Sequence, residues 1–272
     1  MVILKIFVCI KQVPGVSEVK IDPKTNTLVR EGIPSIVNPH DKHAVELGVS
    51  LREKYGGEVI ALSMGPPQAE KALREALAMG ADIAYLLTDR AFAGADTLAT
   101  SHTLALGIKK LLVDSKEKEN YLVICGTQAI DGDTAQVGPE LAEELSIPQI
   151  TYVLKFELKG EDKICVERAF RAEEVVVIET KLPALISVLK EINKPRNPSM
   201  KGTVDAYSKK QVIPLTAEDL GVDSKELGLN GSQTEVWRIF VPQRKGKHIR
   251  LEGTIEEMSQ NLCKNLKDDK II

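Results

Sequence analysis

Short apolar runs alternate with longer segments of helical periodicity through the first half of the chain. Short runs that are apolar throughout are typical of strands buried on both faces, and apolar residues three and four positions apart are typical of helices. The predicted strands are Ile3–Cys9, Glu58–Met64, Ile83–Leu87 and Tyr121–Cys125. This alternation predicts an α/β fold with a doubly wound, mostly parallel sheet that is covered by helices on both faces.

Start and stop signals limit the predicted helices. Asn38-Pro39 combines a favoured N-cap with a favoured first residue, and Gly56-Gly57 ends the helix that follows. Asp96 is a suitable N-cap for a helix over Thr97–Val113. Between the first strand and the first helix, Lys20–Val37 carries a turn signal and predicts a small hairpin.

The pattern changes after Thr151, where four more short strands indicate an added, partly antiparallel sheet. They are Tyr152–Leu158, Lys163–Phe170, Glu174–Glu179 and Ala184–Val188. After Glu191 the chain is polar, rich in proline and predicted to be loop-rich as far as about Gly231. A last strand at Trp237–Val241 and a helix at Thr254–Leu266 follow.

These changes divide the chain into two predicted regions, a ligand-binding α/β domain over residues 1–192 and a partner-binding region over residues 193–272. The irregular stretch from about Thr203 to Gly253 needs a surface to pack against, so we interpret it as an arm that wraps a partner subunit. A flexible tail is the alternative, but a solvated tail does not need large apolar residues. This stretch contains Val204, Ile213, Leu215, Leu227, Leu229 and Trp237.

The carboxyl ends of parallel strands form the sheet edge at which ligands bind in folds of this kind. Cys9, Met64 and Cys125 each end a predicted strand, so Met64-Gly65 and Cys125-Gly126 are expected to lie side by side at that edge. Neither cysteine has an activating base nearby in the sequence, so both are interpreted as small apolar spacers. No residue is assigned a catalytic role.

The segment after this last strand is the main candidate for ligand binding. Gly126–Pro139 contains three glycines, the carboxylates Asp131 and Asp133, and several amide or hydroxyl side chains before a helix at Glu140–Leu145. Glycine lets a ligand approach the backbone, and the start of a helix favours negative charge, so the segment predicts a nucleotide or anion site. The alternative is an ordinary turn, because the segment is neither a P-loop nor a G-x-G-x-x-G motif.

The two carboxylates of this segment must point away from a bound phosphate. Asp133 is predicted to N-cap the following helix, with Gln136 completing a capping box, although this places Pro139 inside the helix. Asp131 is predicted to accept hydrogen bonds from ribose hydroxyls or from backbone N–H groups.

Composition excludes several classes of partner. The net charge of −3 over 272 residues gives no electrostatic footprint for nucleic acid or an acidic membrane surface. The apolar run Met1–Ile10 is interrupted by Lys5 and has no cleavage site, so it is predicted to be a strand and not a targeting segment. The four cysteines lack C-x-x-C spacing, which predicts no disulfide framework and no metal site and favours the cytoplasm.

Several stretches in the same order resemble the β subunit of electron transfer flavoproteins. They are Val37-Asn38-Pro39, Ala76–Asp82, Cys125–Asp131, Leu182–Val188 and Pro195-Arg196, and together they cover nearly the full length. The resemblance implies an adenine-nucleotide-binding, Rossmann-like α/β domain with an extended C-terminal arm that embraces an α subunit.

Two branches of this family differ in their ligand, which is a structural AMP in one and a second FAD in the electron-bifurcating other. Gly132–Pro139 resembles the bifurcating branch, because the AMP-binding branch has a third acidic residue where Gly132 stands. Ala93–Ser101 is also similar to the bifurcating branch. This similarity is chemically reasonable, because small residues admit a flat isoalloxazine ring and the hydroxyl groups of Thr97 and Thr100 can form hydrogen bonds with flavin or ribityl oxygens. The alternative is that this stretch only caps a helix.

The chemistry of the loop and the resemblance together assign cofactor binding to residues at four strand ends and the loops that follow them. The assigned residues are Cys9, Asn38, Asp41, Met64, Gly65, Ala95, Asp96, Thr97, Thr100, Cys125, Gly126, Gln128, Asp131, Gly132, Asp133, Thr134, Gln136 and Val137.

The resemblance further implies that NADH delivers a hydride to the β-subunit FAD, which sends one electron to ferredoxin and the other through the α-subunit FAD to a flavin-dependent dehydrogenase. Asn193–Gly202 corresponds to the loop that docks this dehydrogenase, through Asn197, Ser199 and Met200. Met200 replaces the usual leucine among altered neighbours, which leaves both an acyl-CoA and a 2-hydroxyacid (lactate-type) dehydrogenase open. The alternatives are a non-bifurcating subunit with structural AMP and a nucleotide-binding regulatory protein.

Overall fold

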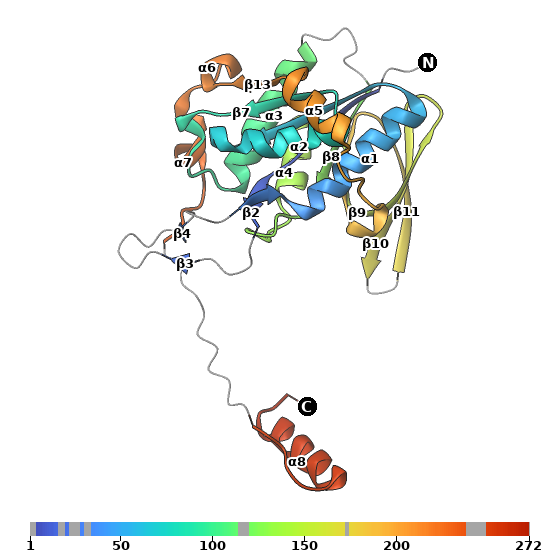
Figure 1. Ribbon diagram of the computed structural model, residues 1–272, viewed down its shortest axis with the longest axis vertical. Coiled ribbons are helices and arrows are strands. Elements are labelled where there is room, and N and C mark those ends of the chain that lie inside the picture. Colours follow the sequence, from blue (N-terminus) through green and yellow to red (C-terminus); the bar gives the residue numbers. More distant parts are fainter. Residues whose placement is uncertain are drawn as a thin grey trace. The chain divides into compact units, whose positions relative to one another are not determined.

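The computed structural model describes residues 4–15, 20–21, 28–29, 34–113, 120–171, 174–237 and 249–271 (Figure 1). The chain divides into two compact units. The larger unit consists of Met1–Lys20 and Leu28–Trp237, and the smaller one of Ile21–Thr27 and Arg238–Ile272.

The larger unit contains a nine-stranded sheet in the order β11-β10-β9-β12-β8-β1-β6-β7-β13. Every neighbouring pair from β9 to β13 is parallel, whereas β9, β10 and β11 pair antiparallel. The bounds are β1 Lys5–Cys9, β6 Glu58–Met64, β7 Ile83–Leu87, β8 Tyr121–Gly126, β9 Gln149–Lys159, β10 Lys163–Arg171, β11 Glu174–Lys181, β12 Ala184–Val188 and β13 Val212–Leu215. The predicted doubly wound, mostly parallel sheet with added antiparallel strands is confirmed.

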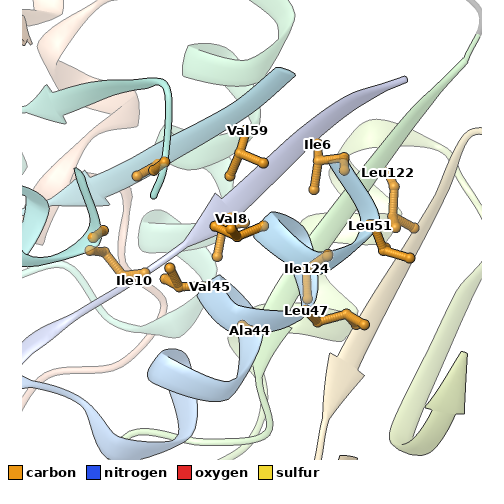
Figure 2. Close-up of a cluster of buried hydrophobic side chains, with 14 of the residues drawn as sticks. Ile6, Val8, Ile10, Ala44, Val45, Leu47, Leu51, Val59, Leu122 and Ile124 are labelled. Carbon is orange, nitrogen blue, oxygen red and sulfur yellow. The ribbon is translucent and has the colours of Figure 1, made fainter. Parts of the chain in front are cut away.

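Helices cover both faces of this sheet. On one face, Ile6 and Val8 of β1 pack against α1 (Pro39–Tyr55) and α2 (Glu70–Met79), which Figure 2 shows for α1. On the opposite face, Phe7 belongs to a second apolar cluster with α3 and α4. These two helices span Thr97–Val113 and Val137–Leu145. Alternate residues of one strand thus supply two cores, as a strand buried on both faces requires.

The predicted limits of α1 are confirmed. Asn38 occupies the N-cap position, Pro39 is the first helical residue, and the N–H of Gly56 bonds the carbonyl of Arg52 to end the helix. Gly57, which follows, has φ +109° and lies so close to β1 that a Cβ atom would be 2.1 Å from the carbonyl oxygen of Leu4. Only glycine fits this conformation and this contact.

The remaining helices and strands are short, apart from α8. They are β2 Gln12–Pro14, β3 Lys20–Ile21, β4 Leu28–Val29, β5 Ser35–Val37, η1 Pro67–Ala69, η2 Arg90–Phe92, η3 Lys190–Ile192, α5 Met200–Ser208, α6 Ala217–Leu220, η4 Ser224–Glu226, α7 Gly228–Gly231 and α8 Ile255–Asp268. β2 pairs antiparallel with β5, and most of the predicted hairpin turn between residues 20 and 37 lies outside the described residues. In the smaller unit, α8 confirms the predicted C-terminal helix, with a capping box between Thr254 and Glu257.

Two predictions about the second half are corrected by the structure, and a third falls mostly outside the described residues. Ala184–Val188 does not join the antiparallel addition but lies within the parallel sheet, between β8 and β9. The region between 193 and 231 is not all loop, because α5 packs on α2 and β13 extends the parallel sheet beside β7. The predicted strand Trp237–Val241 has no strand geometry at Trp237, and its other residues lie outside the described ones.

We expect Gly57→Ala to lower the free energy of unfolding by about 3 kcal/mol, because the added methyl group collides with backbone that cannot move away. Gly160→Ala is the matched control, since φ is +70° there but no atom lies within 4 Å of the added Cβ. Its cost should stay near about 1 kcal/mol. Urea denaturation of both variants measures the difference, and equal losses would contradict the assigned contact.

Candidate functional site

Three parallel strands end together at one edge of the sheet. Cys9 at the end of β1 pairs with Leu62 of β6 on one side and with Cys125 of β8 on the other. Met64-Gly65 and Cys125-Gly126 therefore share this edge but are not side by side, which corrects the prediction. The strand that begins the chain lies between them, an order that local sequence patterns do not specify.

Asn38 ties the start of α1 to the loop after β8. Its side chain is buried and makes no capping bond; instead, Nδ2 donates to the carbonyl oxygen of Gln128 at 2.8 Å. Its Oδ1 accepts from the N–H of Ile130 at 3.2 Å. A residue suited to a helix N-cap thus holds a segment about 90 residues away in the sequence.

Asp41 joins three segments beneath the same loop. Its buried carboxylate accepts from the N–H of Lys11 at 2.7 Å and from Asn38 Nδ2 at 2.9 Å, and it also bonds the backbone of Gly126. A Cβ atom on Gly126 would lie 2.3 Å from Asp41 Oδ1, so glycine is required there for the helix to approach the strand end. Burial raises the pKa of Asp41 to about 7, although these hydrogen bonds favour the charged form.

In the loop after β8, the carboxylates of Asp131 and Asp133 each bond another side chain of the protein, as expected if a phosphate binds nearby. Their bonding partners differ from the predicted ones. Asp131 forms an ion pair with Lys11 Nζ at 2.8 Å, and Asp133 accepts a hydrogen bond from Gln128 Nε2. The prediction that Asp133 N-caps the helix is wrong. Asp133 has φ +56°, a left-handed conformation, and α4 begins later, with Gln136 at the N-cap position.

The later start of α4 also removes the difficulty with Pro139, which becomes the third helical residue and needs no N–H there. Ala135 has φ +55°, the second left-handed residue in this loop. Among the described residues, no acceptor is found for the N–H groups of Thr134, Ala135, Gln136 and Val137. Consecutive unsatisfied donors beside a helix start form a site for an anion.

The start of α3, just after a second loop, lies against the start of α4. Thr97 Oγ1 donates to Glu140 Oε1 at 3.1 Å, and the other carboxylate oxygen of Glu140 is buried without a partner in the described part of the chain. Burial raises the pKa of Glu140. Asp96 caps α3 as predicted, accepting from the N–H of Ala99 at 2.9 Å, and Thr100 follows in the first turn of that helix.

Asp96 has a second role that the sequence did not predict. Its other oxygen accepts from the N–H groups of Gln233 and Thr234 at 2.9 and 3.0 Å, and its own N–H donates to Ser232 Oγ at 2.8 Å. One carboxylate therefore both starts α3 and holds the segment over 232–234. Both carboxylate oxygens of Asp96 are therefore engaged within the chain.

The contacts described above link several of the residues assigned to cofactor binding, and they involve two residues outside the predicted set, Lys11 and Glu140. Lys11 and Glu140 were absent from the predicted set because their contacts with Asp131 and Thr97 are long-range. A detectable signal was available for Lys11, since it is the first charged residue beyond a strand end. His40, in the first turn of α1, has a buried Nδ1 without a partner among the described residues, and burial lowers its pKa.

The residues assigned to partner docking lie elsewhere, in the loop after η3 and at the first residue of α5. Asn197 and Ser199 are exposed, and Ser199 Oγ accepts from the N–H of Gly202 at 2.9 Å to cap α5. Met200 is 86% exposed. In the described part of the chain no cluster of three or more potential metal ligands occurs, and no helix there combines the length and apolar content needed to cross a bilayer.

This geometry defines a class, doubly wound α/β proteins with a polar loop and a row of unsatisfied N–H groups at the carboxyl edge of the sheet. Comparison with known proteins makes it specific, since residues 25–219 match the electron transfer flavoprotein domain. The chain is 55% identical to electron transfer flavoprotein subunit beta of Thermoanaerobacterium thermosaccharolyticum over 269 residues, 99% of this chain and 100% of that protein.

Two further relatives are similar to this chain over almost its full length. Electron transfer flavoprotein subunit beta of Clostridium acetobutylicum is 49% identical over 269 residues, and the caffeyl-CoA reductase-Etf complex subunit CarD of Acetobacterium woodii is 49% identical over 274 residues. Each alignment covers 99% of this chain and 100% of the relative. The chain belongs to the β subunits of the electron transfer flavoprotein family. Its role is in electron transfer, and flavin and AMP are the ligands associated with this family.

The raised pKa of Asp41 gives the fold a specific pH dependence. The folded state keeps this proton up to about pH 7, whereas the unfolded chain releases it near its ordinary pKa of about 4, so the free energy of unfolding falls as pH rises between these values. We expect the stability of the wild-type chain relative to Asp41→Asn to fall by about 2 kcal/mol from pH 5 to pH 7.

Urea denaturation at both pH values measures this difference. Glu161→Gln, at an exposed hairpin turn, is the control and should show no such change. A pH-independent difference between the wild-type chain and Asp41→Asn would show that Asp41 ionises normally in the folded state.

Proposed function

We propose that the edge formed by β1, β6 and β8 binds FAD and that the chain is the β subunit of an electron-bifurcating flavoprotein. The main support is the row of N–H groups over Thr134–Val137, which suits the negatively charged diphosphate of a dinucleotide. Neutralisation of Asp131 by Lys11, and the bond from Gln128 to Asp133, reduce the repulsion that the two carboxylates would exert.

The second loop supports a ligand that is larger than AMP. Thr97 lies beside Glu140 at the starts of α3 and α4, close in sequence to the small residues Gly94 and Ala95, and one oxygen of Glu140 is buried without a partner among the described residues. A buried polar atom without a partner indicates a group that the protein chain does not supply. In this proposal the flavin end of the dinucleotide lies toward α3, and its ADP half lies along the loop after β8.

No side chain is required as an acid or base. When bound, FAD supplies the hydride acceptor for NADH and the source of single electrons for ferredoxin and for the FAD of the α subunit. The residues of this chain hold the phosphates, orient the ring system and set the local charge. The relative CarD, named as part of a caffeyl-CoA reductase-Etf complex, supports a role beside a reductase.

We further propose the functional division that the sequence indicates. Residues 1–192 hold the cofactor, and residues 193–272 serve the partners, with Asn197, Ser199 and Met200 docking an acyl-CoA or 2-hydroxyacid dehydrogenase and the C-terminal region embracing the α subunit. The four cysteines are all unpaired, which supports a reducing compartment, and we place the activity in the cytoplasm.

The ligand content of the complex tests the first part of the proposal. The chain is produced together with its α subunit, the purified complex is denatured, and the released FAD and AMP are quantified. We expect about two FAD and no AMP per heterodimer, one FAD from each subunit. One FAD with one AMP would leave a passive electron carrier and overturn the bifurcating function.

Gly132→Asp sharpens this test, because it introduces the third acidic residue that marks the AMP-binding branch. No atom lies within 4 Å of a Cβ at Gly132, so the substitution leaves the fold intact. We expect it to lower the FAD content of the complex toward one per heterodimer. Gly160→Asp adds the same charge in an equally open turn far along the sheet, and it should leave the FAD content unchanged.

Bifurcation makes a separate kinetic prediction. The complex should reduce ferredoxin with NADH only while the dehydrogenase and its oxidised substrate accept the second electron, since the two transfers are coupled. Ferredoxin absorbance under anaerobic conditions, followed with and without the dehydrogenase substrate, measures this coupling. Equal ferredoxin reduction in both conditions would exclude bifurcation while leaving FAD binding in place.

A further inference from the structure

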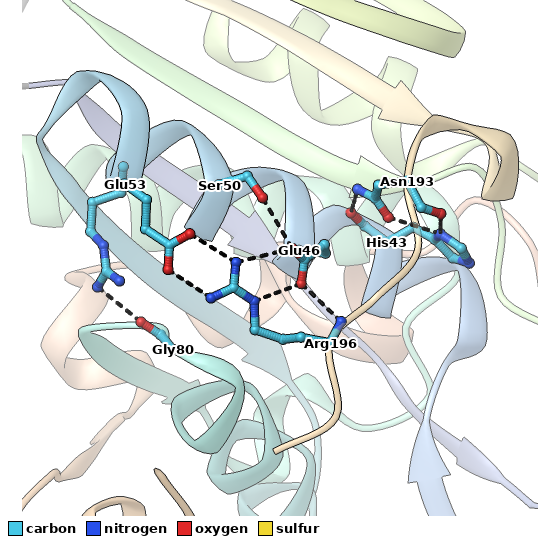
Figure 3. Close-up of polar contacts among 8 residues, drawn as sticks. His43, Glu46, Ser50, Glu53, Gly80, Asn193 and Arg196 are labelled. Atoms are coloured by element: carbon cyan, nitrogen blue, oxygen red, sulfur yellow. Dashed lines mark hydrogen bonds and ion pairs between the residues drawn. The ribbon is translucent and has the colours of Figure 1, made fainter. Parts of the chain in front are cut away.

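Arg196 is clamped against two carboxylates of α1 (Figure 3). Its N–H and Nε donate to Glu46 Oε2 at 2.9 and 2.8 Å, and its Nη2 donates to Glu46 Oε1 at 3.0 Å. On the other side, Nη1 and Nη2 donate to the two oxygens of Glu53 at 2.6 and 2.9 Å. The guanidinium group thus makes paired contacts with two carboxylates, a geometry that lysine cannot reproduce.

The same face of α1 also contacts the segment that contains Arg196 about one helical turn earlier, at His43. Asn193 Nδ2 donates to the carbonyl oxygen of His43 at 2.9 Å, and His43 Nδ1 lies 3.1 Å from the main-chain oxygen of Asn193 (Figure 3). His43, Glu46 and Glu53 recur at helical spacing on one face. The start of the loop is therefore fixed to α1 at two points, residues 193 and 196.

The electrostatics of this clamp favour its charged form. Burial alone would raise the pKa of Glu46, which is 8% exposed, but hydrogen bonds from Arg196 and Ser50 bring it below its ordinary value. Hydrogen bonds from Arg196 likewise lower the pKa of Glu53. The clamp therefore persists at neutral pH and weakens only when the pH falls through the lowered pKa values of these two carboxylates.

A second anchor lies just beyond the loop. Gly202 of α5 approaches α2 so closely that a Cβ atom would lie 2.4 Å from the carbonyl oxygen of Ala78. Arg74 of α2 donates to the carbonyl oxygens of Ala206 and, at 2.8 Å, of Lys210. The exposed segment Asn197–Met200, which we call the docking tip, thus stands between two fixed points, one on α1 and one on α2.

Helix α1 also belongs to the cofactor site. Its start carries Asn38, bonded to Gln128, and Asp41, which contacts Gly126. Three turns of the same rigid helix therefore connect the loop that binds the cofactor to the clamp that holds the docking tip. Neither anchor of the tip depends on a partner being present.

We propose that Arg196 is a positioning residue, which fixes the docking tip to α1 and so presents Met200 to the dehydrogenase in a defined place relative to the cofactor. The inference rests on the proposed docking function of Asn197, Ser199 and Met200. Ordering the tip before binding removes an entropic cost that docking would otherwise carry. The contribution of Arg196 is therefore to partner affinity and not to the chemistry of the flavin.

The test uses the complex with the α subunit and compares Arg196→Lys, Arg196→Gln and Glu53→Gln with the wild-type chain. Hydrogen exchange of peptides covering residues 197–203 reports the order of the tip without any dehydrogenase. We expect exchange there to accelerate about tenfold in Arg196→Gln, less in Glu53→Gln, and to be only partly restored in Arg196→Lys. Arg171→Gln, at the exposed end of β10, is the matched control.

Electron transfer to an acyl-CoA dehydrogenase, and in parallel to a 2-hydroxyacid dehydrogenase, supplies the second readout. For the dehydrogenase that docks, Arg196→Gln should raise the KM for the flavoprotein about 3- to 10-fold with kcat and FAD content unchanged. Unchanged exchange in all three variants, or accelerated exchange with unchanged KM, would overturn the positioning role.

Met200→Ala separates this inference from the function on which it rests. If Met200 is the docking anchor, its truncation raises KM while hydrogen exchange of the tip stays as in the wild-type complex. An unchanged KM in Met200→Ala with both dehydrogenases would overturn the docking function itself, whatever the Arg196 variants show.

Discussion

The close approach of the end of β8 to the first turn of α1 is the constraint on which the site depends. A side chain at Gly126 would occupy the position of the Asp41 carboxylate. Because that approach is possible, Asp41 reaches the backbone of Gly126 and Lys11, and Asn38 reaches the loop beyond Gln128. The left-handed residues Asp133 and Ala135 and the start of α4 follow in the same loop, and the row of N–H groups lies there.

Local patterns were sufficient where a short segment determines its own structure. The apolar runs of β6 and β7 predicted both strands residue for residue, and the cap signals at Asn38-Pro39 and Gly56 predicted the limits of α1. The prediction failed where distant segments decide. The position of β1 between β6 and β8, and of β12 inside the parallel sheet, depends on pairing that no single segment encodes.

The same contrast between local signals and long-range contacts applies to the candidate site. Glycine and polar composition located the loop after β8, but the predicted role of Asp133 was wrong, because its backbone is left-handed and α4 begins only after Gln136. Lys11 and Glu140 were missed because their partners are far away in the sequence. Residues 193–231 were predicted to be loop-rich, and α5 and β13 were not predicted there because they are too short for clear periodicity and are stabilised by packing on α2 and β7.

The shared helix α1 has a consequence for how proteins of this kind can diverge or be re-engineered. A docking loop transplanted from another relative would lose its base unless Glu46 and Glu53 of α1 were transplanted with it. Under the proposed function, one helix thus carries contacts that serve both the cofactor loop and the docking tip, so the two regions of the chain are not independent modules.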